Sequence, residues 1–295
     1  MFEYVLFAAL TLAQAQTDQT VPVQKGTRLE ISNFAGDVKI VTWDRDAVRV
    51  EAEHSDRQSV EIRPGEQRLI IRGNSRNGGM RSIDYTFSVP KWMSITVNGN
   101  YTDVDMQGVG GDVNVETTRG DINVSGGTGF ISLKSVQGSI SLSNAKGRMD
   151  IMNVNDDIHV ADVSGDLTAG TTNGSITLER IDSSNVDAYT VNDNISYDGP
   201  IRDKGVYRLT SHNGGISLAV PDRTNATMSI RTYQGGFRAT FPVKVEDQSS
   251  RRRFSLTLGD GSARVEIETF NGSIMLRRPG ETPPSNRRDR DRNPR

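Results

Sequence analysis

The 295 residues carry 35 Lys and Arg against 37 Asp and Glu, and this formal net charge of −2 gives no global field that would attract nucleic acid. Hydrophobic residues make up 34% and aromatic residues 6%, too few for a thick core of packed helices. The chain contains no Cys, which excludes disulfides, thiolate nucleophiles and Cys-based zinc sites.

The first predicted element, residues 1–15, is a cleavable secretory signal peptide. An apolar stretch from Tyr4 to Leu12 is followed by Ala13-Gln14-Ala15, a small-x-small cleavage site. The stretch before it is weak as a signal because it carries Glu3 and no Lys or Arg, so a buried N-terminal strand is the alternative. No later apolar run approaches the ~20 residues of a membrane helix. We therefore expect an exported chain without a transmembrane segment, in the periplasm, at the cell surface or in the medium.

Residues 16–100 are predicted to form an N-terminal β cap and the first coils. Apolar and polar residues alternate through this region, and Gly36 opens the segment GDVKI. A repeat protein whose apolar end stayed open would aggregate, so we interpret this region as the cap.

Residues 101–278 contain a nine-residue repeat of Gly-polar-aliphatic-polar-aliphatic type. Its units begin at Thr102, Gly111, Gly120, Gly129, Gly138, Gly147, Asp156, Gly165 and Gly174, and the same register extends backward to a unit at Met93. Alternation with period two predicts strands, and nine residues leave no room for a crossover helix. After Gly174 one half of the motif recurs at Asp193, Gly214, Gly235 and Gly272, so a coil holds two strands. The sequence predicts an all-β fold, a β-solenoid of β-helix or β-roll type with about 18–21 residues per coil.

Stacked coils bring like residues into columns. One inward column is predicted to run Ile122, Ile140, Ile158, Ile176, Ile195, Ile216, Phe237 and Ile274. Before each turn Gly, an amide column is predicted to run Arg119, Gln137, Asn155, Asn173, Asn192, Asn213, Gln234 and Asn271. Amides at strand spacing can hydrogen-bond along the axis, so this column is mainly a turn-stabilising feature, with a polar ligand-binding ladder as the alternative.

Two segments interrupt or follow the repeat body. Residues 241–262 are predicted to form a hairpin insertion that projects outward. Residues 279–295 are rich in Arg and Pro and are predicted to be a disordered basic tail, solvated or in contact with an anionic surface.

The order of these segments resembles the bacterial "putative adhesin" family of β-strand-repeat proteins, a domain of unknown function. The matching stretches are Asn33 to Asp44 (NFAGDVKIVTWD), Phe87 to Trp92 (FSVPKW), the GD[IV] units from Gly111 onward and Thr269 to Leu276 (TFNGSIML). The resemblance runs from about residue 25 to residue 278. It implies a secreted or cell-envelope β-solenoid, and it supplies no catalytic or binding residues.

Residues with catalytic chemistry are scarce. The chain has three His and no G-x-S-x-G segment, so we predict no enzyme and no catalytic residue. The Asp residues of the repeat are interpreted as turn residues, with occasional calcium binding as the alternative. We predict no cofactor and no metal. Tyr189, Tyr207 and Tyr233 in the late coils could share a face and form a glycan-binding stripe.

The sequence therefore predicts a non-enzymatic envelope or surface protein that binds or scaffolds in the manner of an adhesin. The expected partner is a cell-surface glycan or another envelope component, with no specific nucleic acid; the oligomeric state stays open. Two alternatives are kept: a structural solenoid that assembles end to end, and a polysaccharide-active β-helix enzyme.

Overall fold

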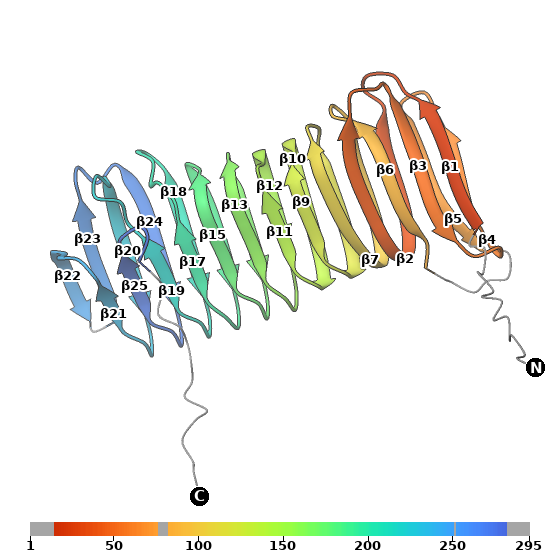
Figure 1. Ribbon diagram of the computed structural model, residues 1–295. Coiled ribbons are helices and arrows are strands. Elements are labelled where there is room, and N and C mark those ends of the chain that lie inside the picture. The colour runs from red at the N-terminus through yellow and green to blue at the C-terminus, as the bar shows by residue number, and fades with distance from the viewer. Residues whose placement is uncertain (1–14, 76–81, 251, 282–295) are drawn as a thin grey trace, which may run out of the picture.

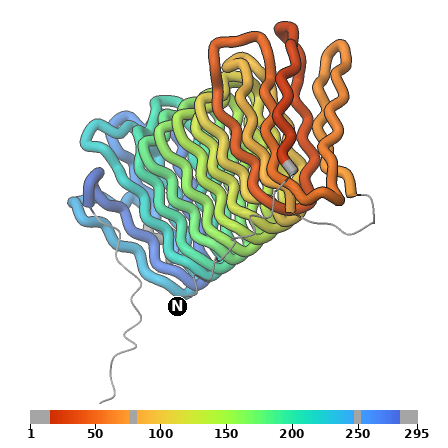
Figure 2. Tube along the Cα trace, turned by 45° about the vertical axis from the view of Figure 1, so that its right-hand side comes forward, coloured from red at the N-terminus to blue at the C-terminus, as the bar shows by residue number. Residues whose placement is uncertain are grey.

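The computed structural model describes residues 15–75, 82–250 and 252–281. Nearly all of the predicted signal peptide and of the basic tail lie outside these residues. Every regular element within them is a β-strand, so the fold is all-β. The strands stack along one axis into an elongated body (Figure 1), and Figure 2 shows its successive turns of chain from the yellow to the blue end.

The strands fall into three groups along the chain. The N-terminal strands are β1 (Ala15–Pro22), β2 (Arg28–Trp43), β3 (Ala47–His54), β4 (Gln58–Pro64), β5 (Arg68–Ser75), β6 (Asp84–Pro90) and β7 (Ser94–Val109). The body contains β8 (Val113–Arg119), β9 (Ile122–Gly126), β10 (Thr128–Gln137), β11 (Ile140–Ser143), β12 (Lys146–Met152), β13 (Ile158–Ser164), β14 (Leu167–Thr171), β15 (Ile176–Asp182), β16 (Asn185–Thr190), β17 (Ile195–Asp198), β18 (Val206–Ser211) and β19 (Ile216–Ala219). The C-terminal strands are β20 (Ala226–Thr232), β21 (Phe237–Ala239), β22 (Val245–Ser250), β23 (Arg253–Leu258), β24 (Ala263–Thr269) and β25 (Ile274–Arg277).

In the body, each strand pairs in parallel with the strand two places along the chain. Ile140 of β11 lies opposite Ile122 on one side and Ile158 on the other, so the predicted spacing of 18 residues between stacked strands is confirmed. The even-numbered strands from β8 to β18 form one face, which we call the first face, and the odd-numbered strands from β9 to β19 form the second face. One strand of each face makes a coil.

The core lies between the two faces and follows from the alternation of the repeat. The six isoleucines that the sequence placed first in the inward column are at most 1% exposed: Ile122, Ile140, Ile158, Ile176, Ile195 and Ile216. Parallel strands with aliphatic side chains in register bury their apolar area without large side chains, which is why a low aromatic content suffices.

The corners bring backbones into close contact. Gly138 has a φ of 122°, and a Cβ at this position would overlap the carbonyl of Gly120 in the preceding coil. Inside this corner a column of buried side chains donates to the turn carbonyls of the preceding coil. Its members are Thr117, Ser135, Asn153, Thr171, Thr190, Ser211, Thr269 and Thr232. These side chains thus give the buried carbonyls at the corner a hydrogen-bond donor.

At the C-terminal end, stacking order departs from chain order. β24 and β25 insert between β18–β19 and β20–β21, because β25 pairs with both β19 and β21. Ile274 therefore lies between Ile216 and Phe237 in the inward column, and the predicted order of these three is wrong. Both coils carry the same Gly-x-Ile/Phe pattern, so the pattern could not distinguish the two orders.

The expected hairpin at residues 241–262 is present as β22 and β23, but it does not project outward. β23 pairs antiparallel with β20 over six residues and extends the first face. Leu256 is fully buried in this position, so the apolar side of the hairpin closes the end of the core.

The N-terminal end shows a related arrangement. The long strands β2 and β7 each run through both faces and pair with each other along 13 positions from Arg28↔Ser94 to Val41↔Gln107. β5 and β6 lie outside β2, although they precede β7 in the chain. β4 then pairs antiparallel with β5, and β3 with β6, while β1 pairs antiparallel with β3.

Candidate binding surface

An amide ladder runs along the corner that leads from the first face to the second. Asn173 Nδ2 donates to Asn155 Oδ1 at 2.9 Å, and Asn192 Nδ2 donates to Asn173 Oδ1 at 2.8 Å. Asn213 and Asn271 continue the ladder at 2.7 and 2.8 Å. The predicted amide column is thus confirmed as a hydrogen-bonded ladder from Asn155 to Asn271, with Asn271 following Asn213 because of the exchanged stacking order. Gln137 pairs with Arg119 instead, and in the described residues no side-chain bond joins Gln234 to the ladder.

The ladder leaves hydrogen-bonding capacity unused. Each inner Asn spends one N–H and one oxygen lone pair on its neighbours, whereas an amide offers two of each. These side chains are exposed. The corner therefore presents donors and acceptors repeated at the strand spacing of about 4.8 Å.

An apolar row runs beside the ladder, one position earlier in each coil. Its members in stacking order are Val136, Val154, Thr172, Val191, His212, Phe270 and Tyr233. Val136, Val154 and Val191 are 42%, 39% and 40% exposed. Valine side chains normally face the interior, and three exposed ones in one row, with Thr172 between Val154 and Val191, favour an interaction surface. Sequence reasoning missed this row because the sequence alone does not distinguish a Val at a corner from a Val in the core.

Toward the C-terminal end the row becomes aromatic. The rings of His212 and Phe270 stack with centroids 4.9 Å apart and planes 5° apart. Tyr233 tilts against Phe270 at 5.3 Å. Tyr233 and Phe270 are more than one-third exposed, so the stack presents ring edges to solvent.

The three tyrosines predicted to form one stripe do not share a face. Tyr207 is 1% exposed, because it lies between Val186 and Val265 in an inward column of the first face. Its hydroxyl donates to the Ser183 carbonyl at 2.6 Å and accepts the Arg202 N–H at 2.7 Å, and burial raises the pKa of the phenol. Tyr233 lies at the corner, and Tyr189 lies on the outside of the first face. The predicted stripe is therefore wrong for Tyr207.

Tyr189 adjoins the apolar row. It is two residues before Val191, with buried Thr190 between them, so both side chains point outward. Its ring lies over Gly170 in the preceding coil, and its hydroxyl is 3.1 Å from the Met152 sulfur one coil further. Partial burial and the nearby carboxylates of Asp150 and Asp187 raise its pKa.

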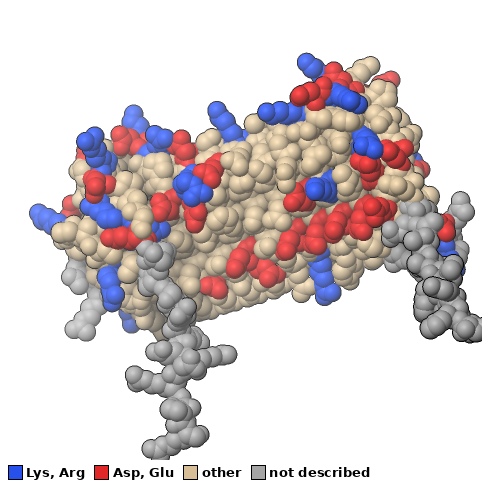
Figure 3. Space-filling model, in the orientation of Figure 1, with Lys and Arg blue, Asp and Glu red and all other residues tan. Residues whose placement is uncertain are grey.

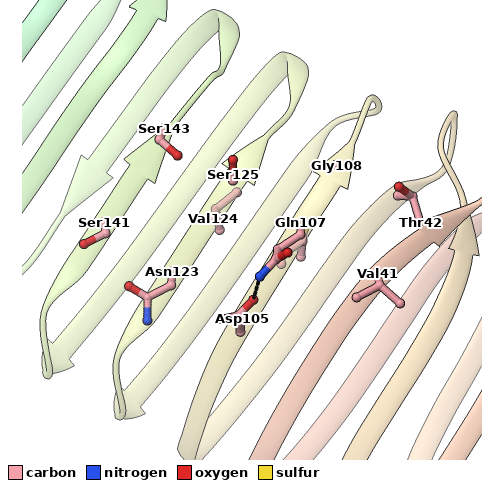
Figure 4. A pocket seen from close by; sticks show the side chains of 11 residues that line it. Val41, Thr42, Asp105, Gln107, Gly108, Asn123, Val124, Ser125, Ser141 and Ser143 are labelled. Atoms are coloured by element: carbon pink, nitrogen blue, oxygen red, sulfur yellow. Dashed lines mark hydrogen bonds between the residues drawn. The ribbon is translucent and has the colours of Figure 1, made fainter.

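The second face carries a shallow hollow with a cavity volume of about 720 Å³, over β2, β7, β9 and β11 (Figure 4). Short polar side chains line it, including Asn123, Ser125, Ser141 and Ser143. Gln107 Nε2 donates to Asp105 Oδ1 at 3.1 Å across its floor. Among the described residues that line the hollow, Asp105 alone is acidic, so it lacks the carboxylate pair of a glycosidase.

A larger hollow of about 1420 Å³ lies at the N-terminal end, between the β1–β2 connection and the β4–β5 turn. Its lining mixes both charges, with Lys25, Arg28 and Arg68 beside Glu30 and Glu66. This mixture favours no single sign of ligand charge.

Acidic side chains form a row along the molecule (Figure 3). In one register column, Asp84 Oδ1 accepts the N–H of Asp37, Asp103 Oδ1 that of Asp121, and Asp121 Oδ1 that of Ser139. Each of these carboxylates thus forms a hydrogen bond between one coil and its neighbour. Burial and the charges of Asp84 and Asp103 raise the pKa of Asp37. Within residues 15–75, 82–250 and 252–281, no group of three or more His, Cys, Asp or Glu is arranged to hold a metal ion.

Comparisons with known proteins identify a matching family. The model of the family described as Toastrack DUF4097 matches residues 26–277. A "putative adhesin" from Bacteroides fragilis NCTC 9343 is 9% identical with a TM-score of 0.43, over 90% of this chain and 98% of that chain. A "putative adhesin" from Parabacteroides merdae ATCC 43184 is 11% identical with a TM-score of 0.34, over 88% and 95%. No curated protein sequence matches the chain. In the described part of the chain, no helix has the length and apolar character needed to span a bilayer.

Proposed function

The chain belongs to the Toastrack DUF4097 family, which confirms the resemblance drawn from its sequence, and from that premise we propose a non-enzymatic binding and scaffold protein of the cell surface or envelope. The proposed ligand is an extended polymer that lies along the stacking axis. The amide ladder and the apolar row together, which we call the amide corner, are the proposed contact.

The observation that carries the proposal is the repetition of this corner from coil to coil. Unused amide donors and acceptors recur beside exposed Val154 and Val191 at the strand spacing. A polymer with hydroxyl or amide groups along its length can meet several such positions at once. Weak contacts that engage together give useful avidity without a deep pocket.

We further infer that the coiled body is a β-solenoid. The pairings advance by one coil at a time, and they end rather than close on themselves. In the described residues β1 pairs with β3 alone, and β21 pairs with β25 alone. A closed barrel would require its terminal strands to pair with each other.

Export to the periplasm, the cell surface or the medium is part of the same proposal. Its support is the apolar stretch that ends in Ala13-Gln14-Ala15. A long, polar, rod-like surface that offers repeated weak contacts suits attachment in the envelope.

The two alternatives have weaker support. End-to-end assembly requires matching parallel edges, whereas antiparallel strands β1, β3 and β4 cover one end and β22 and β23 extend the first face at the other. A polysaccharide-cleaving enzyme requires paired carboxylates, and the hollow on the second face offers Asp105 alone among its described lining residues.

The proposal is tested by sedimenting the purified full chain with isolated bacterial envelopes and with purified cell-wall polysaccharide. The double variant Val154→Asp/Val191→Asp should lose at least tenfold in affinity, because it places charge in the apolar row. Val206→Asp is the matched control: Val206 is 42% exposed at the start of β18, away from the amide corner, and binding should persist. A wild-type chain that binds neither preparation, or a double variant that binds like the wild type, contradicts the proposal.

A further inference from the structure

Tyr189 is held flat on the first face by a notch in the preceding coil. A Cβ at Gly170 would lie 2.5 Å from the Tyr189 hydroxyl oxygen and 2.7 Å from Cε2, so the ring occupies the space that a side chain would fill. The hydroxyl reaches the Met152 sulfur at 3.1 Å. One side of the ring is thus covered by the sheet, while the residue as a whole is 42% exposed. The remaining exposure belongs to the opposite ring face and its edge.

Two carboxylates lie on one side of this ring. Asp150 and Asp187 occupy the neighbouring outward column, with Thr168 between them in register. Both are near enough to act electrostatically on the Tyr189 hydroxyl. Arg208 contacts Asp187 at 3.4 Å and thereby orients one of the two. On the other side of the ring lies the apolar row with Val154 and Val191.

We propose that Tyr189 is the platform of a carbohydrate subsite that takes a neutral hexopyranose unit of the polymer, an inference that rests on the proposed function. The apolar C–H face of a pyranose ring packs on an exposed aromatic face, and the hydroxyls at its rim donate to Asp150 and Asp187. The flat support by Gly170 fixes the ring before the ligand arrives, which reduces the entropic cost of binding.

Charge complementarity selects the class of sugar. Because Asp187 is paired with Arg208, the repulsion of uronate or phosphate groups comes chiefly from Asp150, which has no ion pair among the described residues, whereas hydroxyls of a neutral sugar can donate to both carboxylates. The subsite should therefore discriminate between neutral and anionic oligosaccharides of equal length.

Calorimetric titration of the full chain with cellohexaose, chitohexaose and an oligogalacturonate hexamer tests the subsite. We expect binding of at least one neutral hexamer and none of the anionic one. Tyr189→Ala should weaken neutral binding at least tenfold, and Tyr189→Phe should change it less than threefold because the platform remains. Gly170→Ala retains the tyrosine but displaces its ring, so it should weaken binding at least fivefold.

Phe130→Ala is the matched control, since Phe130 is a 46% exposed aromatic near the start of β10, at the end of the first-face strands opposite the amide corner, and its loss should not affect binding. Thermal unfolding of each variant separates loss of binding from loss of fold. Equal affinities of the wild type, Tyr189→Ala and folded Gly170→Ala for a neutral hexamer overturn the subsite. So does an absence of neutral-hexamer binding while envelope binding still depends on Val154 and Val191. The latter result leaves the proposed function intact, whereas loss of all envelope binding rejects the function itself.

Discussion

The body and the two ends of this molecule use the same kind of strand but follow different rules of order. From β8 to β19, each coil stacks on the coil that precedes it in the chain, with offsets of 18 to 21 residues. At the ends, strands that are distant in sequence become neighbours, such as β19 with β25 and β2 with β7. Regular repetition therefore specifies the body through local spacing, whereas the ends require long-range pairing and antiparallel strands.

The largest expected effect tests the exchanged order at the C-terminal end. Ile176→Ala in the body and Ile274→Ala in the last coil of the chain should each lower the free energy of unfolding by about 3 kcal/mol, since both side chains are fully buried between coils. Phe237→Ala should cost roughly 1–2 kcal/mol, because half-buried Phe237 lies in the outer coil. Urea unfolding measures all three. If Ile274→Ala were milder than Phe237→Ala, the chain would stack in sequence order.

A smaller effect on stability is expected when an inner Asn of the amide ladder is compared with Gln234 in the outer coil. Asn173→Ala removes two ladder bonds and should destabilise the fold by about 1 kcal/mol, a low value because these amides are exposed to water. Gln234→Ala at the outer coil should change stability by less than about 0.5 kcal/mol, since no side-chain bond joins it to the ladder in the described residues. Equal midpoints in chemical denaturation for the two variants would show that the ladder adds no stability.

The smallest effect concerns the crowded acids of the N-terminal end. The pKa of Asp37 is raised in the folded chain, so the folded state binds its proton more tightly than the unfolded state does, and stability falls as pH rises through that pKa. Asp37→Asn should raise Tm at pH 7 by about 1–2 °C and give no advantage below pH 4.

Asp157 in the body is the comparison for Asp37. Its carboxylate accepts the N–H and Oγ–H of Ser175 at 2.7 and 2.8 Å, and it has Ser rather than Asp on both sides in its column. Asp157→Asn should therefore lower Tm at pH 7 or leave it unchanged. A stabilising Asp157→Asn, or a destabilising Asp37→Asn, contradicts this assignment of charge repulsion. Scanning calorimetry across pH 3–8 measures both variants.

The sequence was sufficient for the strand type, the nine-residue unit, the inward columns and the amide ladder, because each of these repeats locally. It could not decide the position of Ile274, since two coils of equal pattern competed for one place. It also misassigned Tyr207, although Leu209 two residues later is an inward partner and indicated the inward side. The row of Val136, Val154 and Val191 was invisible to pattern reasoning, because the burial of a corner residue depends on the path of the turn.

The placement of β24 and β25 between two earlier coils also sets an order of events during synthesis. A chain that emerges from its N-terminus can wind as far as β19, but the strands β20 and β21 have no parallel neighbour until residues 263–277 have been made. A prematurely ended product would leave the open edge of β18 and β19 unpaired. The last coils of the rod can therefore form only when nearly all of the described chain is present, because β24 and β25 lie between β18–β19 and β20–β21 and pair with both.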